Sequence, residues 1–234
     1  KDDRETRLGP KRACTEGWVT LPAMRRCLVV TTALACLVGL PLVCFGGWEM
    51  VLVGAACVLF CFLYTTLLAQ HGMGDVLVLL FFGLVPVCLT YYVTMPPASQ
   101  TITAQVVWAS LACGLVIDTL LVVNNYRDYD QDRAVGKKTL IVRMGRERAE
   151  QLYGWLGNIA TYMMWGCLVL GDSSFVLMLV CFACFVPYAL LHGATRVQMR
   201  RIGRGRELNK VLGMTARNMF VFGVTTAIVT LFIL

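Results

Sequence analysis

The feature that most constrains the fold is a series of long apolar runs, which together take up most of the chain. A run of about 20 residues crosses a hydrocarbon core about 30 Å thick as a helix. The runs are continuously apolar and lack the alternation of a membrane β-strand, so helices are expected. We predict an all-α, polytopic transmembrane helix bundle with seven spans. They are Cys27–Gly47, Met50–Ala69, Asp75–Val93, Thr103–Val123, Leu152–Leu170, Ser173–His192 and Thr215–Leu234.

The charged residues are few and unevenly placed. Only 15% of the residues are charged, against about 25% in soluble domains, which argues against a water-soluble globule. All 21 Lys and Arg residues lie within 1–26, 127–148 and 196–217. Loops rich in Lys and Arg face the cytoplasm. The sequence therefore predicts a multi-pass protein of the cytoplasmic (inner) membrane whose basic face is cytoplasmic.

This distribution also limits the expected partners. A net charge of +7 could suggest nucleic-acid binding, but basic segments beside apolar runs are typical of loops next to a lipid bilayer. We therefore expect the bilayer as a partner, no nucleic acid and no obligate protein partner. Ten of the eleven cysteines lie inside apolar runs, where cysteine behaves as a small hydrophobic residue, so no disulfide framework is expected.

One polar segment, NNYRDYDQDRAVGKKTLIVRMG at 124–145, carries the residue types needed for chemistry. Asn124, Asp128 and Asp132 are four residues apart, so they share one face if the helix of the fourth span continues past the membrane surface. Asp130 would point away. Two carboxylates and an amide oxygen suit a hard cation such as Mg²⁺, which completes its shell with phosphate oxygens and water.

Basic residues follow this acidic face directly. Gly136 allows a backbone turn, after which the ammonium groups of Lys137 and Lys138 can reach an anion held by the metal. A solvated loop is the alternative interpretation of such a run of charges. The order of carboxylates, glycine and paired lysines favours a metal and diphosphate site.

The same segment resembles the second aspartate-rich motif of the UbiA superfamily of intramembrane aromatic prenyltransferases. The Asn-Asn-x-Arg-Asp start at 124–128 and the Gly-Lys-x-Thr-Leu continuation at 136–140 are most similar to the branch that acts on 1,4-dihydroxy-2-naphthoate in menaquinone biosynthesis. Further segments agree with that branch, and the similarity runs essentially end to end. They are RLGPKR at 7–12, GD at 74–75, FFG at 81–83, TYYV at 90–93 and LNKVLGMTAR at 208–217.

The resemblance implies a fold of nine transmembrane helices, with a first aspartate-rich motif at the end of the second helix. Seven spans are counted in this sequence. We therefore expect residues 1–234 to form a single membrane prenyltransferase domain that lacks the first two helices and most of the first motif. Asp3 would be the last acid of that motif. With half of the metal site missing, this fragment is not expected to be catalytically competent.

The resemblance also implies a reaction and the residues that perform it. The branch transfers a polyprenyl chain from polyprenyl diphosphate to 1,4-dihydroxy-2-naphthoate with decarboxylation, giving demethylmenaquinol and diphosphate, and its active face is cytoplasmic. The expected Mg²⁺ ligands are Asp128, Asp132 and Asn124, which form the catalytic set, together with Asp3. The expected diphosphate-binding residues are Lys137, Lys138, Lys11, Arg12 and Arg143, with Arg217 as a further candidate.

Four further features carry alternatives. Asp118 lies inside the fourth span, where an ionisable group is costly, and is either functional or a polar contact. Asp75 starts the third span, either as a first-turn acid or as a substrate-facing group. His192 is expected to reach the membrane interface. The loop 196–208, with five arginines, is expected to bind the anionic leaflet, and a lid over the diphosphate is the alternative.

Other functions stay open at this point. A cation-coupled membrane transporter is disfavoured because no span is interrupted in matching halves and the acidic cluster lies at a membrane end. A CDP-alcohol phosphotransferase also uses Asp-x3-Asp, but its upstream Asp-Gly and Ala-Arg elements have no counterpart before Asp128. Within the superfamily, 4-hydroxybenzoate or homogentisate is the alternative aromatic acceptor.

Overall fold

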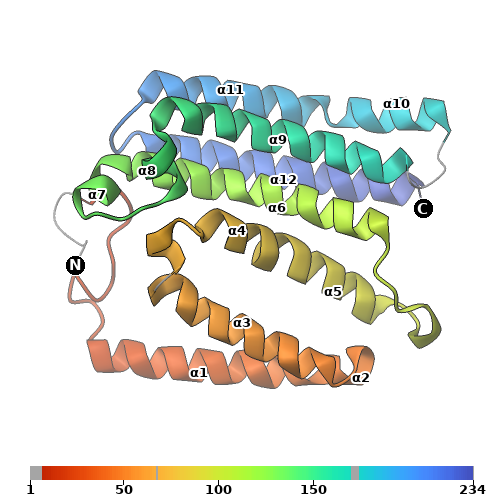
Figure 1. Ribbon diagram of the computed structural model, residues 1–234, viewed down its shortest axis with the longest axis horizontal. Helices are drawn as coiled ribbons and strands as arrows, with labels where there is room; N and C mark the ends of the chain where they lie inside the picture. The colour runs from red at the N-terminus through yellow and green to blue at the C-terminus, as the bar shows by residue number, and fades with distance from the viewer. Residues whose placement is uncertain (1–6, 67, 170–173, 234) are drawn as a thin grey trace.

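The computed structural model describes residues 7–66, 68–169 and 174–233, and within these ranges it contains helices and no strands (Figure 1). The predicted all-α bundle is confirmed. In chain order the helices are α1 (Leu21–Gly39), η1 (Leu40–Leu42), α2 (Val43–Gly46), α3 (Glu49–Thr66), η2 (Leu68–His71), α4 (Gly74–Val78), η3 (Leu79–Leu84), α5 (Val85–Thr94), η4 (Pro97–Ser99), α6 (Ala104–Arg127), α7 (Tyr129–Ala134), α8 (Leu140–Met144), α9 (Arg146–Val169), α10 (Phe175–Cys184), α11 (Val186–Ile202) and α12 (Leu208–Ile233).

The chain runs back and forth along the long axis of the bundle through helical segments that match the predicted spans in order (Figure 1). Within the described ranges, five segments are long and apolar enough to cross a membrane: Leu21–Gly46, Gly74–Thr94, Ala104–Arg127, Phe175–Ile202 and Leu208–Phe232. The other two fall short among the described residues. The apolar part of α3 is shorter, at Glu49–Tyr64, and α9 begins with three charged residues and carries Asn158 in its middle.

Several helices extend further than the apolar runs predicted. The prediction that 196–208 is a loop is wrong for its first half, because 196–202 forms the last turns of α11 and only 203–207 connects it to α12. An apolar run reports the thickness of the hydrocarbon core, whereas backbone hydrogen bonding continues until a residue interrupts it. Here Gly203, with φ +67°, caps the helix.

Helix α6 lies at the centre of the bundle, between α9 and α12 on one side and α4, η3 and α5 on the other (Figure 1). Small residues allow the close contact with η3. A Cβ atom on Gly83 would lie 2.7 Å from the carbonyl oxygen of Ser110 and 2.8 Å from Cα of Gly114. Membrane helices approach one another most closely where small residues meet, so these positions set the spacing between the two segments.

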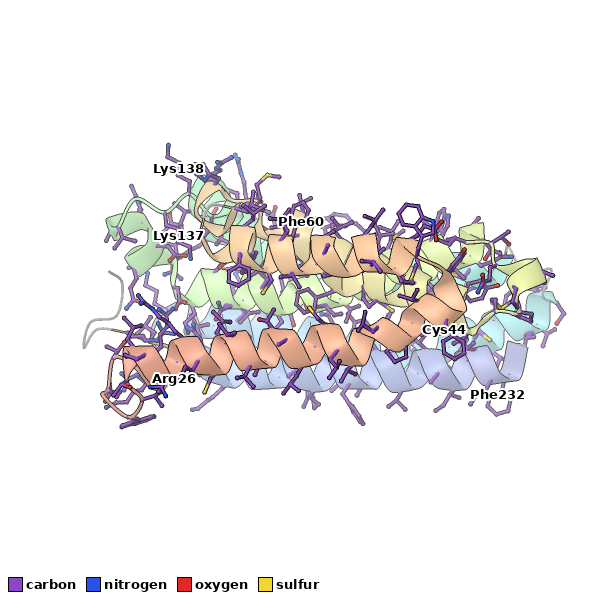
Figure 2. The ribbon with its side chains drawn as sticks, turned by 90° about the horizontal axis from the view of Figure 1, so that it is seen from below. Arg26, Cys44, Phe60, Lys137, Lys138 and Phe232 are labelled. Atoms are coloured by element: carbon purple, nitrogen blue, oxygen red, sulfur yellow. The ribbon has the colours of Figure 1, made fainter. Side chains whose placement is uncertain are left out.

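The basic segments gather at one end of the bundle. In Figure 1 the N-terminal segment, α7, α8 and the α11–α12 connection all lie there, and α2 and η4 lie at the opposite end. Figure 2 shows Arg26, Lys137 and Lys138 toward this end, with Cys44 and Phe232 toward the other. The single basic face predicted from the charge spacing is therefore present in the fold. We call it the basic end.

Candidate active site

A buried arginine organises the acidic residues at the basic end. The side chain of Arg127, at the last position of α6, is only 4% exposed. Its Nε and Nη2 donate to the two carboxylate oxygens of Asp128 at 2.7 and 2.8 Å, and Nη2 also donates to Oδ1 of Asn124 at 2.8 Å. Its Nη1 donates to Oδ1 of Asn209, on α12, at 2.9 Å. One guanidinium thus joins two of the predicted metal ligands to a distant helix.

The expected continuous helix through Asn124, Asp128 and Asp132 is interrupted. Helix α6 ends at Arg127 and α7 begins at Tyr129, so Asp128 lies at the junction. The four-residue hydrogen-bond spacing nevertheless continues across it, from Asp128 N to Asn124 O at 3.1 Å and from Asp132 N to Asp128 O at 2.8 Å. The three side chains therefore keep their one-turn order although the helix is broken.

The turn after α7 places a lysine on the second carboxylate. Gly136 adopts φ +74°, and the backbone N–H of Lys137 donates to the carbonyl oxygen of Asp132 at 2.9 Å. Lys137 Nζ then lies 3.2 and 3.3 Å from the carboxylate oxygens of Asp132. Lys138 is exposed beside it. The predicted glycine turn is confirmed, and it returns the first lysine to the acidic face.

A large cavity of about 1080 Å³ opens beside this cluster. Its lining residues come from the N-terminal segment and the start of α12: Arg7, Leu8, Gly9, Pro10, Lys11, Arg12, Thr15, Glu16, Arg206 and Asn209. Four of the ten are basic, two more, Gly9 and Asn209, contact Arg127, and the acid among them, Glu16, pairs with Lys11 at 2.7 Å. The cavity therefore has a basic wall of a kind that suits an anion, and both predicted basic residues of the N-terminal segment belong to it.

The N-terminal segment is held in place by its backbone. Asn209 Nδ2 donates to the carbonyl oxygen of Leu8 at 3.0 Å, and Arg206 Nη2 donates to that of Arg7 at 3.3 Å. A Cβ atom on Gly9 would lie 3.1 Å from Nη2 of Arg127, so glycine lets the chain pass close over the guanidinium. The Gly-Pro pair quoted from the sequence is thus a close-approach point next to the acidic cluster.

Two of the predicted anion-binding arginines are engaged elsewhere. Arg143 Nη2 donates to the carbonyl oxygen of His71 at 2.9 Å, which ties the turn before α4 to α8. Gly72 lies at this contact, because a Cβ atom there would be 2.5 Å from the carbonyl oxygen of Lys138. Arg217 is exposed on α12 and donates to Oδ1 of Asn218 at 3.2 Å. The structure brings neither arginine onto the cavity wall. Asp3 lies outside the described residues.

Two acids lie buried below the basic end. Asp75, in the first turn of α4, is 8% exposed, and Asp118, on α6, is 2% exposed. One carboxylate oxygen of each, Oδ1, has no hydrogen-bond partner within the described part of the chain. The two acids lie within electrostatic range of each other and of Tyr64. Neither is simply a solvated helix-end acid.

The prediction that His192 reaches the membrane interface is wrong. It is 2% exposed and stacks between the rings of Tyr153 and Tyr188, with centroids 4.4 and 5.6 Å away. Its Nε2 is 2.9 Å from the carbonyl oxygen of Tyr153. Because α11 continues to Ile202, this histidine lies in the helix interior instead of at its end.

Comparison with known proteins decides the family. The model of the UbiA prenyltransferase family matches residues 1–208. The chain belongs to this family. Among curated relatives, the Escherichia coli protein named 1,4-dihydroxy-2-naphthoate octaprenyltransferase is 31% identical over 80% of this chain and 57% of its own length. The protein of the same name from Mycobacterium tuberculosis is 32% identical over 95% of this chain and 73% of its own. No solved structure matches the chain.

The UbiA family generally uses divalent metal ions. Within residues 7–66, 68–169 and 174–233, no three His, Cys, Asp or Glu side chains gather into a metal site. The donors at the junction of α6 and α7 nevertheless fit a hard cation in kind, since Asp128, Asp132 and Asn124 supply oxygens only. Each of them currently accepts hydrogen bonds from Arg127 or Lys137, which shows that positive charge is favoured at this position.

Sequence reasoning missed the residues that assemble the site. Arg127 and Asn209 stood in the quoted family segments, yet nothing in their local pattern showed that one would be buried against the other. The sequence places Arg206 in a segment expected to bind the anionic leaflet, with a lid over the diphosphate as the alternative, and in the structure it lines the cavity. One sequence feature could have predicted this contact. Asn and Arg occur both in 124–145 and in 208–217, and the predicted spans bring these two segments to the same end of the bundle.

Proposed function

We propose that the full-length protein transfers a polyprenyl chain from polyprenyl diphosphate to 1,4-dihydroxy-2-naphthoate, giving demethylmenaquinol, CO₂ and diphosphate. The observation that carries this proposal is that Arg127, which pairs with Asp128, also contacts Gly9 and Asn209 in the wall of the basic cavity. The second acid, Asp132, pairs with Lys137 on the same acidic face. Family membership supports prenyl transfer, and the names of the relatives support this acceptor. Residues 1–234 are proposed to belong to one prenyltransferase domain.

The difficult step is cleavage of the allylic C–O bond, because a multiply charged diphosphate must leave. In the proposed site Lys11, Arg12 and Lys137, with Lys138 next to it, surround the departing oxygens and stabilise the charge that develops on them. Arg143 is proposed to help indirectly, by holding the turn before α4. A divalent cation, with Mg²⁺ the ion expected, adds further charge stabilisation when it is bound by Asp128, Asp132 and Asn124.

The second step is attack of the electron-rich ring on the allylic cation. The ring carbon that bears the carboxylate forms the new C–C bond, and loss of CO₂ from that carbon returns the electron pair to the ring. Water would capture the cation, so the reaction needs a site from which water is excluded. Location at the end of a membrane bundle supports such exclusion, and we propose that the basic end faces the cytoplasm at the inner membrane.

The decisive experiment identifies the lipid product. Membranes containing the full-length protein are supplied with a polyprenyl diphosphate, Mg²⁺ and either 1,4-dihydroxy-2-naphthoate or 4-hydroxybenzoate, and the lipids are analysed by mass spectrometry. A prenylated naphthoquinol without a carboxylate is expected. A prenylated hydroxybenzoate that keeps its carboxylate would overturn the acceptor and leave prenyl transfer standing. Ion uptake into vesicles without any prenylated lipid would favour a transporter.

Matched variants test the proposed ligands. Asp128→Ala and Asp132→Ala should each lower prenyl transfer by about 100-fold or more, because each removes an oxygen from the proposed metal site. Asp130→Ala is the control: this acid lies between them in sequence, yet its side chain is 60% exposed and pairs with Arg146. It should retain activity. Normal Mg²⁺-dependent transfer by either of the first two variants would remove the proposed metal site.

A further inference from the structure

A second, much smaller cavity lies beneath the basic end. It has a volume of about 20 Å³, enough for one water molecule or one hydroxyl group. Its walls come from the end of α3, the turn before α4, α4, α6 and the segment from the turn after α7 to the start of α8. They are formed by Tyr64, Gly72, Gly74, Asp75, Leu121, Asn125, Lys137, Thr139 and Leu140.

One oxygen of the Asp75 carboxylate in this wall lacks a hydrogen-bond partner among the described residues. The residue is buried to 92%, since 8% is exposed, and its Oδ1 accepts no hydrogen bond from any residue that the structure describes. A buried acceptor without a donor is costly, so such a group in a native protein points to a missing donor. The cavity in front of Asp75 has room for that donor group.

A second acid lies behind the first. Leu121 and Asn125 line the cavity together with Asp75 of α4. They follow Asp118 by three and seven residues on α6, so all three side chains share the face of α6 that meets α4. Oδ1 of Asp118 is also without a partner in the described ranges. Two buried acids within electrostatic range of each other favour a ligand with an O–H donor over another acceptor.

The cavity adjoins the proposed diphosphate site. The same Lys137 that pairs with Asp132 also forms part of the cavity wall. A group bound at Asp75 would therefore lie next to the residues that hold the leaving diphosphate. Gly74 keeps this wall close, because a Cβ atom there would lie 3.3 Å from Leu121 and 3.9 Å from the ring of Tyr64.

We propose that Asp75 binds a ring hydroxyl of the aromatic acceptor, with Asp118 behind it and Tyr64 beside it. The inference rests on the proposed function and adds a contact that determines which acceptors bind. A carboxylate that accepts a hydrogen bond from the ring hydroxyl orients the ring beside the diphosphate and makes its carbons more electron-rich. An acceptor without that hydroxyl leaves the buried oxygen unpaired, which is the basis of the selectivity.

The test combines ligand and side-chain changes. Equilibrium binding to the full-length protein in detergent is measured for 1,4-dihydroxy-2-naphthoate, 1-hydroxy-2-naphthoate and 4-hydroxy-2-naphthoate, with wild type, Asp75→Asn and Asp75→Leu. Loss of one of the two hydroxyls should weaken binding to wild type about tenfold. That difference should shrink in Asp75→Asn, whose amide oxygen is a weaker acceptor, and disappear in Asp75→Leu. The KM for the acceptor should rise about tenfold, while the KM for polyprenyl diphosphate stays unchanged.

Controls separate this inference from the proposed function. Asp130 is an exposed acid that pairs with Arg146 and does not line the small cavity. The Asp130→Asn variant should therefore keep the wild-type hydroxyl preference. Thermal unfolding checks that the variants fold. Asp75→Leu is included because an asparagine at this position could still accept a hydrogen bond from the ring hydroxyl, whereas leucine cannot. If wild type prenylates the naphthoate but both variants keep its KM and hydroxyl preference, the cavity holds only a resident water and the inference falls. If wild type neither binds nor prenylates any naphthoate, both proposals fall.

Discussion

Helices α1 and α6 are both long and apolar enough to cross a membrane, yet they lie in different environments. In the apolar segment Leu21–Gly46, which begins with α1, none of the most apolar stretch is buried. In the segment Ala104–Arg127, which is α6, 44% of the most apolar stretch is buried. The difference lies in the contacts that each helix makes. Ser110 and Gly114 of α6 let η3 approach its backbone, while α1, which also carries small residues such as Ala33 and Gly39, has no buried residue. Apolar content thus shows that a helix can enter a membrane, and close contacts with neighbouring helices decide which helices form the core.

This difference also determines where the chemistry is placed. Because α6 is packed on several sides, its last residues have a defined position, and Arg127 can bond to Asn209 on α12. Helix α1 reaches the site through the segment before it, which docks over that arginine at Gly9. The last residues of the packed helix and the junction after it supply proposed ligands, and the segment that precedes the peripheral helix supplies part of the cavity wall.

The strongest test of this comparison removes the buried charge at the end of α6. Arg127→Ala should lower the free energy of unfolding by about 3–5 kcal/mol, because it leaves Asp128 and two amide oxygens without their donor. Thermal or denaturant unfolding in detergent measures the loss. Arg26→Ala, at an exposed arginine of α1, is the matched control and should change stability little. Equal effects of the two variants would contradict the comparison.

A matched pair of leucines tests burial. Leu208→Ala, at a fully buried position of α12, should cost about 2–5 kcal/mol of unfolding free energy, since it removes buried methyl groups and leaves a cavity. Leu37→Ala, at a position of α1 that is 62% exposed, should stay within about 0.5 kcal/mol. The same unfolding assay measures both variants. A large loss at Leu37 would show that α1 is packed in the protein.

A pair of glycines tests the small-residue contact and carries the smallest expected effect. Gly83→Ala should cost about 1–3 kcal/mol, because the new Cβ meets the backbone of α6. Gly54→Ala, in α3, has open space at the Cβ position, and should be neutral or stabilise by up to about 1 kcal/mol. The unfolding midpoint of Gly83→Ala should therefore fall below that of the wild type, and the midpoint of Gly54→Ala should stay the same or rise. Identical shifts would show that backbone contact does not limit this position.

Much of the fold could be predicted from single segments. Runs of apolar residues of membrane length dictate helices, because the backbone must satisfy its hydrogen bonds inside a bilayer. The turn at Gly136 and the return of Lys137 to the acidic face also follow from local sequence. The break at Asp128 and the burial of His192 could not be predicted in this way. Both depend on how α6 and α11 extend and pack against other helices.

The sequence by itself determined the helical class, the basic end and the order of acid, glycine and lysine, because each depends on local periodicity, length or charge. Only the tertiary structure decided the pairings across the chain: Arg127 with Asn209, the N-terminal segment with the basic cavity, and Asp75 with the helix face that carries Asp118. These contacts join residues far apart in sequence. Their energies depend on burial and on the geometry of hydrogen bonds between helices, which no local pattern contains.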